Sequence, residues 1–191
     1  MATLTDRQPD RFQAGFLSEY SLRVNFHAFN RFIDLAPVPA DAQPVLQVEE
    51  QNSDYESGVA SIGKEQWRIR TARIKATKPG AFVAVWKRGE GGSTRPFTVD
   101  ESMSGLLVFV EEKERFGVFQ FTAAHLSSLG YVSSDLHPGK RGFRVYPAWC
   151  TDLNPQASRT QRAQADAFSE LPSSNESRTL TKNGRALQQR P

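Results

Sequence analysis

The sequence predicts one domain of mixed helices and strands, of the class α/β (α+β). Three observations predict this class: apolar residues at helical spacing near the N-terminus, strand-like patterns after Gly63, and a well-capped helix that begins at Asn154. The length of 191 residues suffices for one domain with a buried core. We expect a flexible N-terminus over residues 1–15, a single domain over residues 16–171, and a disordered polar tail over residues 172–191.

The first predicted element is an amphipathic helix near the N-terminus. Its apolar residues recur at helical spacing, and two prolines end the pattern. These residues are Leu22, Phe26, Phe29 and Ile33, followed by Pro37 and Pro39. The next segment, from Val45 to Glu56, is acidic, and its pattern fits a helix and an extended chain equally well.

The basic middle of the chain begins with a predicted strand. Residues 67–70 alternate a tryptophan and an isoleucine with two arginines, which is typical of a β-strand. The alternation loses phase at Thr71 and Ala72, so we expect a β-bulge there. A Lys-Pro-Gly turn at residues 78–80 then leads to a strand over Phe82–Trp86.

An apolar hairpin is the predicted centre of the domain. The continuous apolar run Leu106–Val110 is typical of a central strand, and Phe116–Phe121 is its expected hairpin partner. A short helix over residues 122–129 begins at its threonine N-cap and ends at Gly130. A further strand is predicted over Phe143–Tyr146.

The last predicted element is a helix from Asn154 to Leu171. Asn154 is a good N-cap, and Pro155 suits the first helical position. Gln161 and Gln164 lie on the face that packs inward, where buried amides need hydrogen-bond partners. They either line a polar groove or satisfy backbone groups of the core, and the structural role is favoured.

The charge of the chain is distributed unevenly. The net charge is only +3, but residues 64–147 hold 14 Lys and Arg against 8 Asp and Glu. This clustering favours an anionic partner, and a solvated basic face is the alternative explanation.

The composition argues against several classes of protein. The sequence contains neither a run of about 18 apolar residues nor an N-terminal signal peptide, so we expect a cytoplasmic protein that does not bind a membrane. Cys150 is the only cysteine and the three histidines are scattered, so the spacing predicts neither a metal site nor a cofactor.

The stretch from Gly139 to Trp149 combines cations with aromatic rings. The cations are Lys140, Arg141 and Arg144, and the aromatic residues are Phe143, Tyr146 and Trp149. Cations release counterions from phosphate, and exposed rings stack on unpaired bases with about 1–3 kcal/mol per base. The stretch therefore predicts contact with single-stranded nucleic acid. The alternative is a strand that buries Phe143 and Val145 and solvates Arg144.

Several short motifs occur in a fixed order along the chain. They are Phe82-Val83, Trp86-Lys87-Arg88, Pro96-Phe97, Gly117 with Phe119 and Phe121, the block Gly139–Trp149, and Thr160-Gln161 with Gln164 and Phe168. In the order and spacing of these motifs, the chain from Glu49 to Phe168 resembles the MepB family of small bacterial proteins. The resemblance implies a central mixed sheet flanked by helices, similar to the PD-(D/E)XK restriction-endonuclease-like fold. It also implies that the nuclease residues are lost and that nucleic acid is bound.

A nuclease of that superfamily would need paired carboxylates and a lysine to hold Mg²⁺ and activate water. Asp100 followed by Glu111-Glu112-Lys113 matches this motif formally. The strand at residues 106–110 places the two acids toward opposite ends, far more than about 10 Å apart at about 3.3 Å per residue. We therefore expect residues 111–114 to be a solvated hairpin tip.

A second set of acids precedes the basic strand. Glu50 and Asp54, with Glu49 and Glu56, are the alternative candidates, and they would pair across a groove with Lys75 or Lys78. Mg²⁺ would be the cofactor only in this nuclease alternative. The basic strand itself carries arginines with no carboxylate between them, so it attracts phosphate but gives Mg²⁺ no ligand. We expect no hydrolytic activity.

The predicted function is sequence-independent binding of single-stranded DNA or RNA in a basic-aromatic groove. Cations would follow the phosphates, and Trp149 or Tyr146 would stack on a splayed base, whereas Trp86 is expected to be core more often than platform. The alternatives are a metal-dependent nuclease and a module that binds a protein or a small molecule in a stress or drug response. The predicted nucleic-acid contacts are Arg73, Lys78, Trp86, Lys87, Arg88, Lys140, Arg141, Arg144, Tyr146, Trp149, Gln161 and Gln164.

Overall fold

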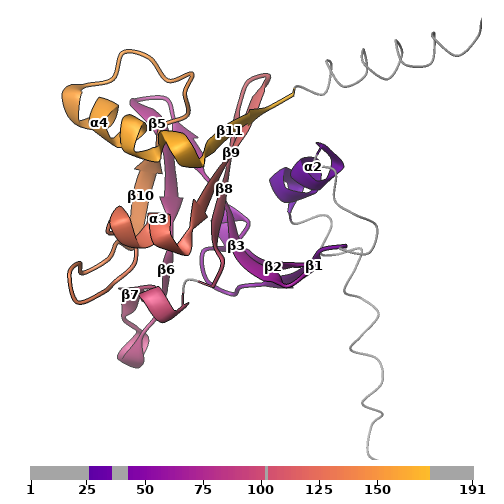
Figure 1. The fold of residues 1–191 in the computed structure, drawn as a ribbon, viewed down its shortest axis with the longest axis vertical. Helices are drawn as coiled ribbons and strands as arrows, with labels where there is room; N and C mark the ends of the chain where they lie inside the picture. The colour runs from indigo at the N-terminus through magenta and orange to yellow at the C-terminus, as the bar shows by residue number, and fades with distance from the viewer. Residues whose placement is uncertain (1–25, 36–42, 102, 173–191) are drawn as a thin grey trace, which may run out of the picture.

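The computed structural model describes residues 26–35, 43–101 and 103–172. This part of the chain folds into a mixed α+β domain, as expected (Figure 1). The tail predicted over residues 1–15 lies outside the described residues, and so does the tail predicted over residues 172–191 beyond its first residue. Leu22, Pro37 and Pro39 also lie outside them.

A six-stranded mixed sheet forms the centre of the domain. Its strands, in spatial order, are β1 (Val45–Val48), β2 (Gly58–Ile62), β3 (Glu65–Thr71), β8 (Gly105–Glu112), β9 (Arg115–Thr122) and β11 (Phe168–Leu171). β3 and β8 are parallel, whereas the other neighbouring strands are antiparallel. The predicted central hairpin is therefore confirmed as β8 and β9.

Strand β8 is buried on both faces, which explains its continuous apolar sequence. Because successive side chains of a strand point to opposite faces, Val108 and Val110 join one core, and Leu107 and Phe109 join another. Helix α2 (His27–Leu35) covers the second core. A smaller sheet lies on the other side of the main sheet (Figure 1), and the first core contains side chains from both sheets.

The smaller sheet has three antiparallel strands. Their order is β10 (Gly142–Val145), β5 (Lys78–Ala84) and β4 (Arg73–Lys75). A separate hairpin, β6 (Trp86–Arg88) with β7 (Thr94–Pro96), follows β5 in the chain. Because β10 pairs with β5, the two basic segments of the sequence become neighbours in space.

The remaining helical elements lie mostly on the side of the smaller sheet (Figure 1). They are α3 (Ala123–Ser128), α4 (Pro155–Gln164) and the 3-10 turns η2 (Ser53–Tyr55), η3 (Glu90–Gly92), η4 (Val99–Glu101) and η5 (Ala165–Ala167). Two predicted N-caps are confirmed. The Thr122 hydroxyl accepts the backbone N–H of His125 at 3.2 Å, and the Asn154 side chain accepts that of Ala157 at 2.8 Å.

The acidic segment Val45–Glu56, which the sequence allowed to be either a helix or an extended chain, begins as strand β1 and ends just after the turn η2. Glu56, just after η2, caps helix α2 from a distant part of the chain. Its carboxylate accepts the backbone N–H groups of His27 at 3.1 Å and Ala28 at 3.3 Å, and the Thr71 hydroxyl at 2.6 Å. A carboxylate is stabilised at a helix N-terminus because the first N–H groups there lack partners within the helix.

The predicted bulge at Thr71 and Ala72 is wrong, because the chain changes sheets there. β3 ends at Thr71, β4 begins one residue after Ala72, and the Ala72 N–H donates to the Phe109 carbonyl at 2.8 Å. The turn predicted at residues 78–80 lies instead at residues 76–77. A two-residue connection is the usual way to join antiparallel neighbours such as β4 and β5.

The predicted C-terminal helix is wrong in its last third. It ends at Gln164, and after η5 the chain forms the edge strand β11, which pairs with β9. The Phe168 ring packs against Phe119, with 4.7 Å between ring centroids. Arg115 and Glu170 form an ion pair between the two strands at 2.8 Å. Pairing with the open edge of β9 thus outweighs the local helical pattern.

Candidate nucleic-acid interface

The outer face of the smaller sheet carries a row of three side chains, Arg73, Phe82 and Arg144. Arg73 on β4 and Arg144 on β10 both pair with Phe82 on β5. Residues that lie opposite each other in antiparallel strands point to the same face. Their neighbours Ala81 and Val145 are fully buried in the core, so the row faces outward.

Tyr55 extends this row from the turn η2. Its ring meets Phe82 edge to face, with 6.3 Å between centroids and 66° between planes. The Arg73 guanidinium lies 5.9 Å from the centre of the Tyr55 ring, and its Nε donates to the Asp54 carbonyl at 2.6 Å. One arginine is therefore held beside the aromatic pair.

A hollow of about 440 Å³ lies beside this row. We call it the aromatic hollow, because three of its lining residues are aromatic and come from η2, β5 and β6. Its lining residues are Asn52, Ser53, Asp54, Tyr55, Phe82, Ala84, Trp86, Arg141 and Gly142. Arg141 is exposed and donates to the Thr94 hydroxyl at 3.3 Å, which holds the cation beside the hollow.

Asn52 connects two sides of the aromatic hollow. Its backbone is left-handed, with φ 61° and ψ 30°, a conformation that asparagine adopts more readily than most residues. Its Nδ2 donates to the Trp86 carbonyl at 2.8 Å. Its Oδ1 is buried and has no hydrogen-bond partner among the described residues. The amide therefore fixes the η2 turn against β6.

Trp149, the tryptophan that the sequence favours as a stacking platform, is engaged in packing. Its indole N–H donates to Glu112 at 2.7 Å, and its ring meets Phe168 at 5.3 Å between centroids. The Arg115 guanidinium lies 4.8 Å from the centre of the same ring. Trp86, expected to be core, is half-buried and lines the aromatic hollow. Trp149 is also half-buried and lines a different hollow, so the two tryptophans differ in their packing partners rather than in their exposure.

Lys78 and Tyr146 lie at the opposite end of the smaller sheet from Trp86. Lys78 begins β5 and lines a second hollow of about 280 Å³ together with Trp149. At about 3.3 Å per residue, the eight positions from Lys78 to Trp86 span roughly 26 Å. The Tyr146 ring packs on Gly80, where an added Cβ would lie 2.6 Å from it. These residues do not share one groove with Trp86.

The two glutamines have structural roles, as favoured from the sequence. Gln164 is 1% exposed; its Oε1 accepts the Tyr146 N–H at 3.0 Å, and its Nε2 donates to the Tyr131 hydroxyl at 2.7 Å and the Arg144 carbonyl at 2.9 Å. Gln161 donates from Nε2 to two backbone carbonyls, at 2.8 and 3.1 Å. Both amides fasten helix α4 to the segment that follows β10.

The remaining predicted cations are spread over the surface. The Lys87 ammonium is paired with Glu101, and Lys140 lies 5.0 Å from the centre of the Tyr131 ring. Arg88 is exposed at the end of β6. Burial opposes ionisation of Glu101, but hydrogen bonds from Lys87 and from a backbone N–H lower its pKa to about 2.

Two arginines of β3 pair with a carboxylate inside the fold and are not free to meet phosphate. Arg70 is completely buried; its Nη1 pairs with Glu49 at 2.7 Å, and its Nε donates to the Ala84 carbonyl at 3.3 Å. Burial lowers the pKa of Arg70, and the neighbouring Glu49 carboxylate counteracts this effect. Arg68 pairs with the same carboxylate at 3.4 Å and lies 3.8 Å from the centre of the Phe97 ring.

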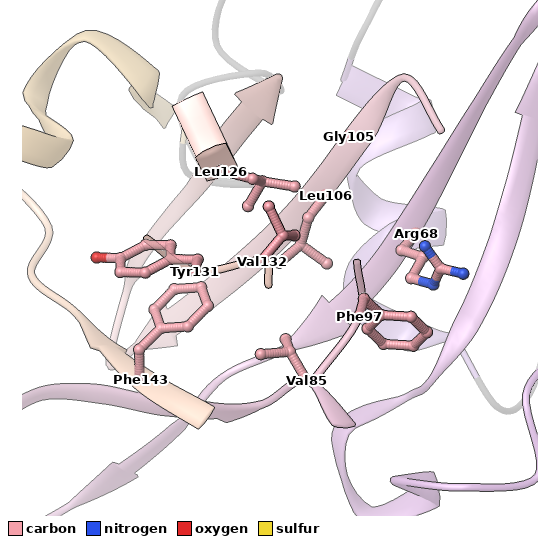
Figure 2. A pocket seen from close by; sticks show the side chains of 9 residues that line it. All are labelled: Arg68, Val85, Phe97, Gly105, Leu106, Leu126, Tyr131, Val132 and Phe143. Atoms are coloured by element: carbon pink, nitrogen blue, oxygen red, sulfur yellow. The ribbon is translucent and has the colours of Figure 1, made fainter. Parts of the chain in front are cut away.

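Figure 2 shows the small apolar cavity next to Arg68. Tyr131 and Phe143 stack in its wall with 3.8 Å between centroids. Its volume of about 20 Å³ is room for roughly one water molecule. The cavity is therefore part of the core, and the aromatic hollow is the larger site by far.

The acidic candidates are separated by their structural roles. Glu49 neutralises the buried arginines and Glu56 caps α2, whereas Glu50 and Asp54 are exposed. Glu111 lies near the C-terminal end of β8 and pairs with Arg31 at 3.1 Å. Asp100 lies in η4, which precedes the N-terminal end of β8, so the two acids are at opposite ends of the strand. Within residues 26–35, 43–101 and 103–172, no three His, Cys, Asp or Glu side chains are grouped so that they could hold a metal ion.

Comparisons with known proteins match the chain to one protein family. The family model described as MepB-like matches residues 49–170. A crystal structure of MepB is 34% identical to this chain with a TM-score of 0.64, and the alignment covers 66% of this chain and 85% of that chain. A search of curated proteins found no match. No helix in the described part of the chain is long and apolar enough to cross a membrane.

Proposed function

The chain belongs to the MepB-like family, and from this premise we propose that it binds single-stranded nucleic acid without cleaving it, through the outer face of the smaller sheet. The observation that carries this proposal is the row Arg73–Phe82–Arg144, which runs across three strands beside the aromatic hollow. The interface is smaller than the set of residues that the sequence suggested, because Trp149, Gln161 and Gln164 are used in packing.

The arrangement of charge supports a phosphate backbone as the ligand. Arg73 and Arg144 lie two strand spacings apart, or about 10 Å, and Arg141 directly precedes β10 and lines the hollow. The Arg144 Nη1 donates to the Pro79 and Gly80 carbonyls, both at 3.1 Å, so only its remaining N–H groups would contact phosphate. Arginine binds phosphate well because its planar fork donates two parallel hydrogen bonds. Three such contacts to a single strand predict a slope of log affinity against log salt of about −2.

The aromatic rings support single strands over duplexes. Tyr55, Phe82 and Trp86 are partly exposed around the hollow, so a base that has left its stack can contact them. In a duplex the bases are already stacked and paired, and only the phosphates would be available. We therefore expect a duplex of equal length to bind more weakly than the single strand.

The test is fluorescence anisotropy of a labelled single-stranded RNA at several salt concentrations, without added metal. The double substitution Arg73→Gln and Arg141→Gln should weaken binding and reduce the salt slope by about 1. The matched control is Lys64→Gln with Lys113→Gln, which removes the same charge from exposed turns of the main sheet. Equal losses in the two double variants, or no binding by the wild type at low salt, would contradict the proposal.

A further inference from the structure

We infer that the aromatic hollow is a pocket for one unstacked nucleobase of the bound strand, an inference that rests on the proposed function. The pocket would bind a single unstacked base of the strand. The phosphates on either side of that base would contact the flanking arginines. Its volume of about 440 Å³ falls within the range of small-molecule sites, which is about 300–1,000 Å³.

The floor of the hollow consists of small residues. Ala84 on β5 pairs directly with Gly142 on β10, and both line the hollow. A Cβ on Gly142 would lie 2.6 Å from the Phe82 ring, so glycine is required for that ring to take its position. Two small residues between large ones on neighbouring strands create the depression.

The walls of the hollow are aromatic on different sides. Phe82 precedes Ala84 by two residues on the same strand, and Trp86 follows it by two. Tyr55 adds a ring at 66° to Phe82, which forms a corner rather than a flat surface. A planar base is the ligand that such faces bind best, and each stacked base contributes about a tenfold gain in affinity.

An arginine lies on each side of the hollow, and the exposed Asp54, which also lines it, offsets part of their positive charge. Arg141 lies on the β10 side, where Thr94 holds it, and Arg73 lies on the side of Tyr55. A base that enters the hollow thus has a cation near each of its two flanking phosphates. This arrangement fits an internal nucleotide of a strand better than a free neutral base.

The shape of the hollow is set before the ligand arrives. The hydrogen bond from Asn52 to the Trp86 carbonyl ties the η2 turn, which carries Tyr55, to the strand that carries Trp86. The Arg73–Asp54 hydrogen bond holds the same turn from its other side. Asn52 is therefore a positioning residue, and a pre-formed pocket avoids the entropic cost of ordering its walls during binding.

The experiment compares two strands of equal length and charge, an oligoadenylate and its fully abasic counterpart, by anisotropy at several salt concentrations. The oligoadenylate should bind about tenfold more tightly, with the same salt slope, and should quench tryptophan fluorescence. The quenching should be lost in Trp86→Phe, which leaves Trp67 and Trp149 in place. Equal affinity of the two strands with a negative salt slope would overturn the base pocket but leave the proposed function standing. No binding of either strand at low salt would overturn both.

Paired substitutions at Tyr55 test the pocket independently of folding. Tyr55→Phe keeps the ring and should keep the tenfold difference between the two strands. Tyr55→Leu removes the ring and should reduce that difference at least threefold, while the affinity for the abasic strand stays unchanged. Unchanged binding of the abasic strand also shows that the variant is folded. If Tyr55→Leu weakened the binding of both strands equally, the inference would be wrong.

Discussion

The indole N–H of Trp149 donates to Glu112 at 2.7 Å, across two segments that are 37 residues apart in the sequence. Together with the contact to Phe168, this bond makes Trp149 a packing residue of the first core. Trp149, which the sequence favoured as an exposed stacking residue, is thus hydrogen-bonded to the last residue of β8.

Trp149→Leu should therefore lower stability and leave nucleic-acid binding unchanged. Loss of the half-buried ring and its hydrogen bond should cost about 2 kcal/mol of the free energy of unfolding, measured by urea denaturation. Anisotropy with single-stranded RNA should give the wild-type affinity. If the variant had wild-type stability and weakened binding, Trp149 would be a nucleic-acid contact and not a packing residue.

Glu49→Gln should strongly destabilise the protein, because it leaves the buried charge of Arg70 without its carboxylate. Removing one partner of a buried ion pair costs about 3–5 kcal/mol. The control is its neighbour, Glu50→Gln, which changes an exposed side chain and should stay within about 0.5 kcal/mol of the wild type. Similar urea midpoints for the two variants would contradict the role given to Glu49.

Gln164→Leu should cost about 3 kcal/mol of the free energy of unfolding. The substitution keeps the volume but leaves the Tyr146 N–H, the Tyr131 hydroxyl and the Arg144 carbonyl without the partner they have in the wild type. Gln156→Leu, on the exposed side of the same helix, is the matched control and should be nearly neutral. If both variants unfolded at the same urea concentration, the buried amide would not be a structural link.

Glu101 should contribute to acid denaturation. Its pKa is lowered in the folded protein to about 2 from an ordinary value of 4.5, so its contribution to stability is fully present above pH 4.5 and is lost as the pH falls toward 2. In Glu101→Gln, the dependence of the unfolding free energy on pH should be flatter within this window. Glu90→Gln, at an exposed carboxylate between β6 and β7, is the control for the removal of one carboxylate. An unchanged slope in Glu101→Gln would rule out this ion pair as a source of acid sensitivity.

The sequence predicted the elements whose signals are local. Thr122 and Asn154 cap their helices, and the apolar run of β8 lies at the centre of the main sheet, because capping and continuous hydrophobicity depend on near neighbours. The family resemblance found from short motifs is also confirmed, over residues 49–170.

The features that the sequence did not predict depend on distant partners. Arg70 is buried because β3 lies between β2 and β8, and its carboxylate comes from a residue 21 positions earlier. The chain after Gln164 becomes a strand because the edge of β9 is free to pair with it. The alternating arginines of β3 were the sequence signal that could have predicted this ion pair. In a strand that is covered on both faces, arginine side chains need a carboxylate partner.

The single residue between β3 and β4 gives the protein a natural spectroscopic reporter. The Ala72 amide is bonded to the Phe109 carbonyl in the main sheet, and its next neighbour in the chain is Arg73 of the binding face. Its amide resonance therefore responds to changes in both the central strand and the outer row. A chemical-shift change at Ala72 during a titration would report occupancy of the outer face, and a change at the Phe109 amide as well would show that the effect extends to β8.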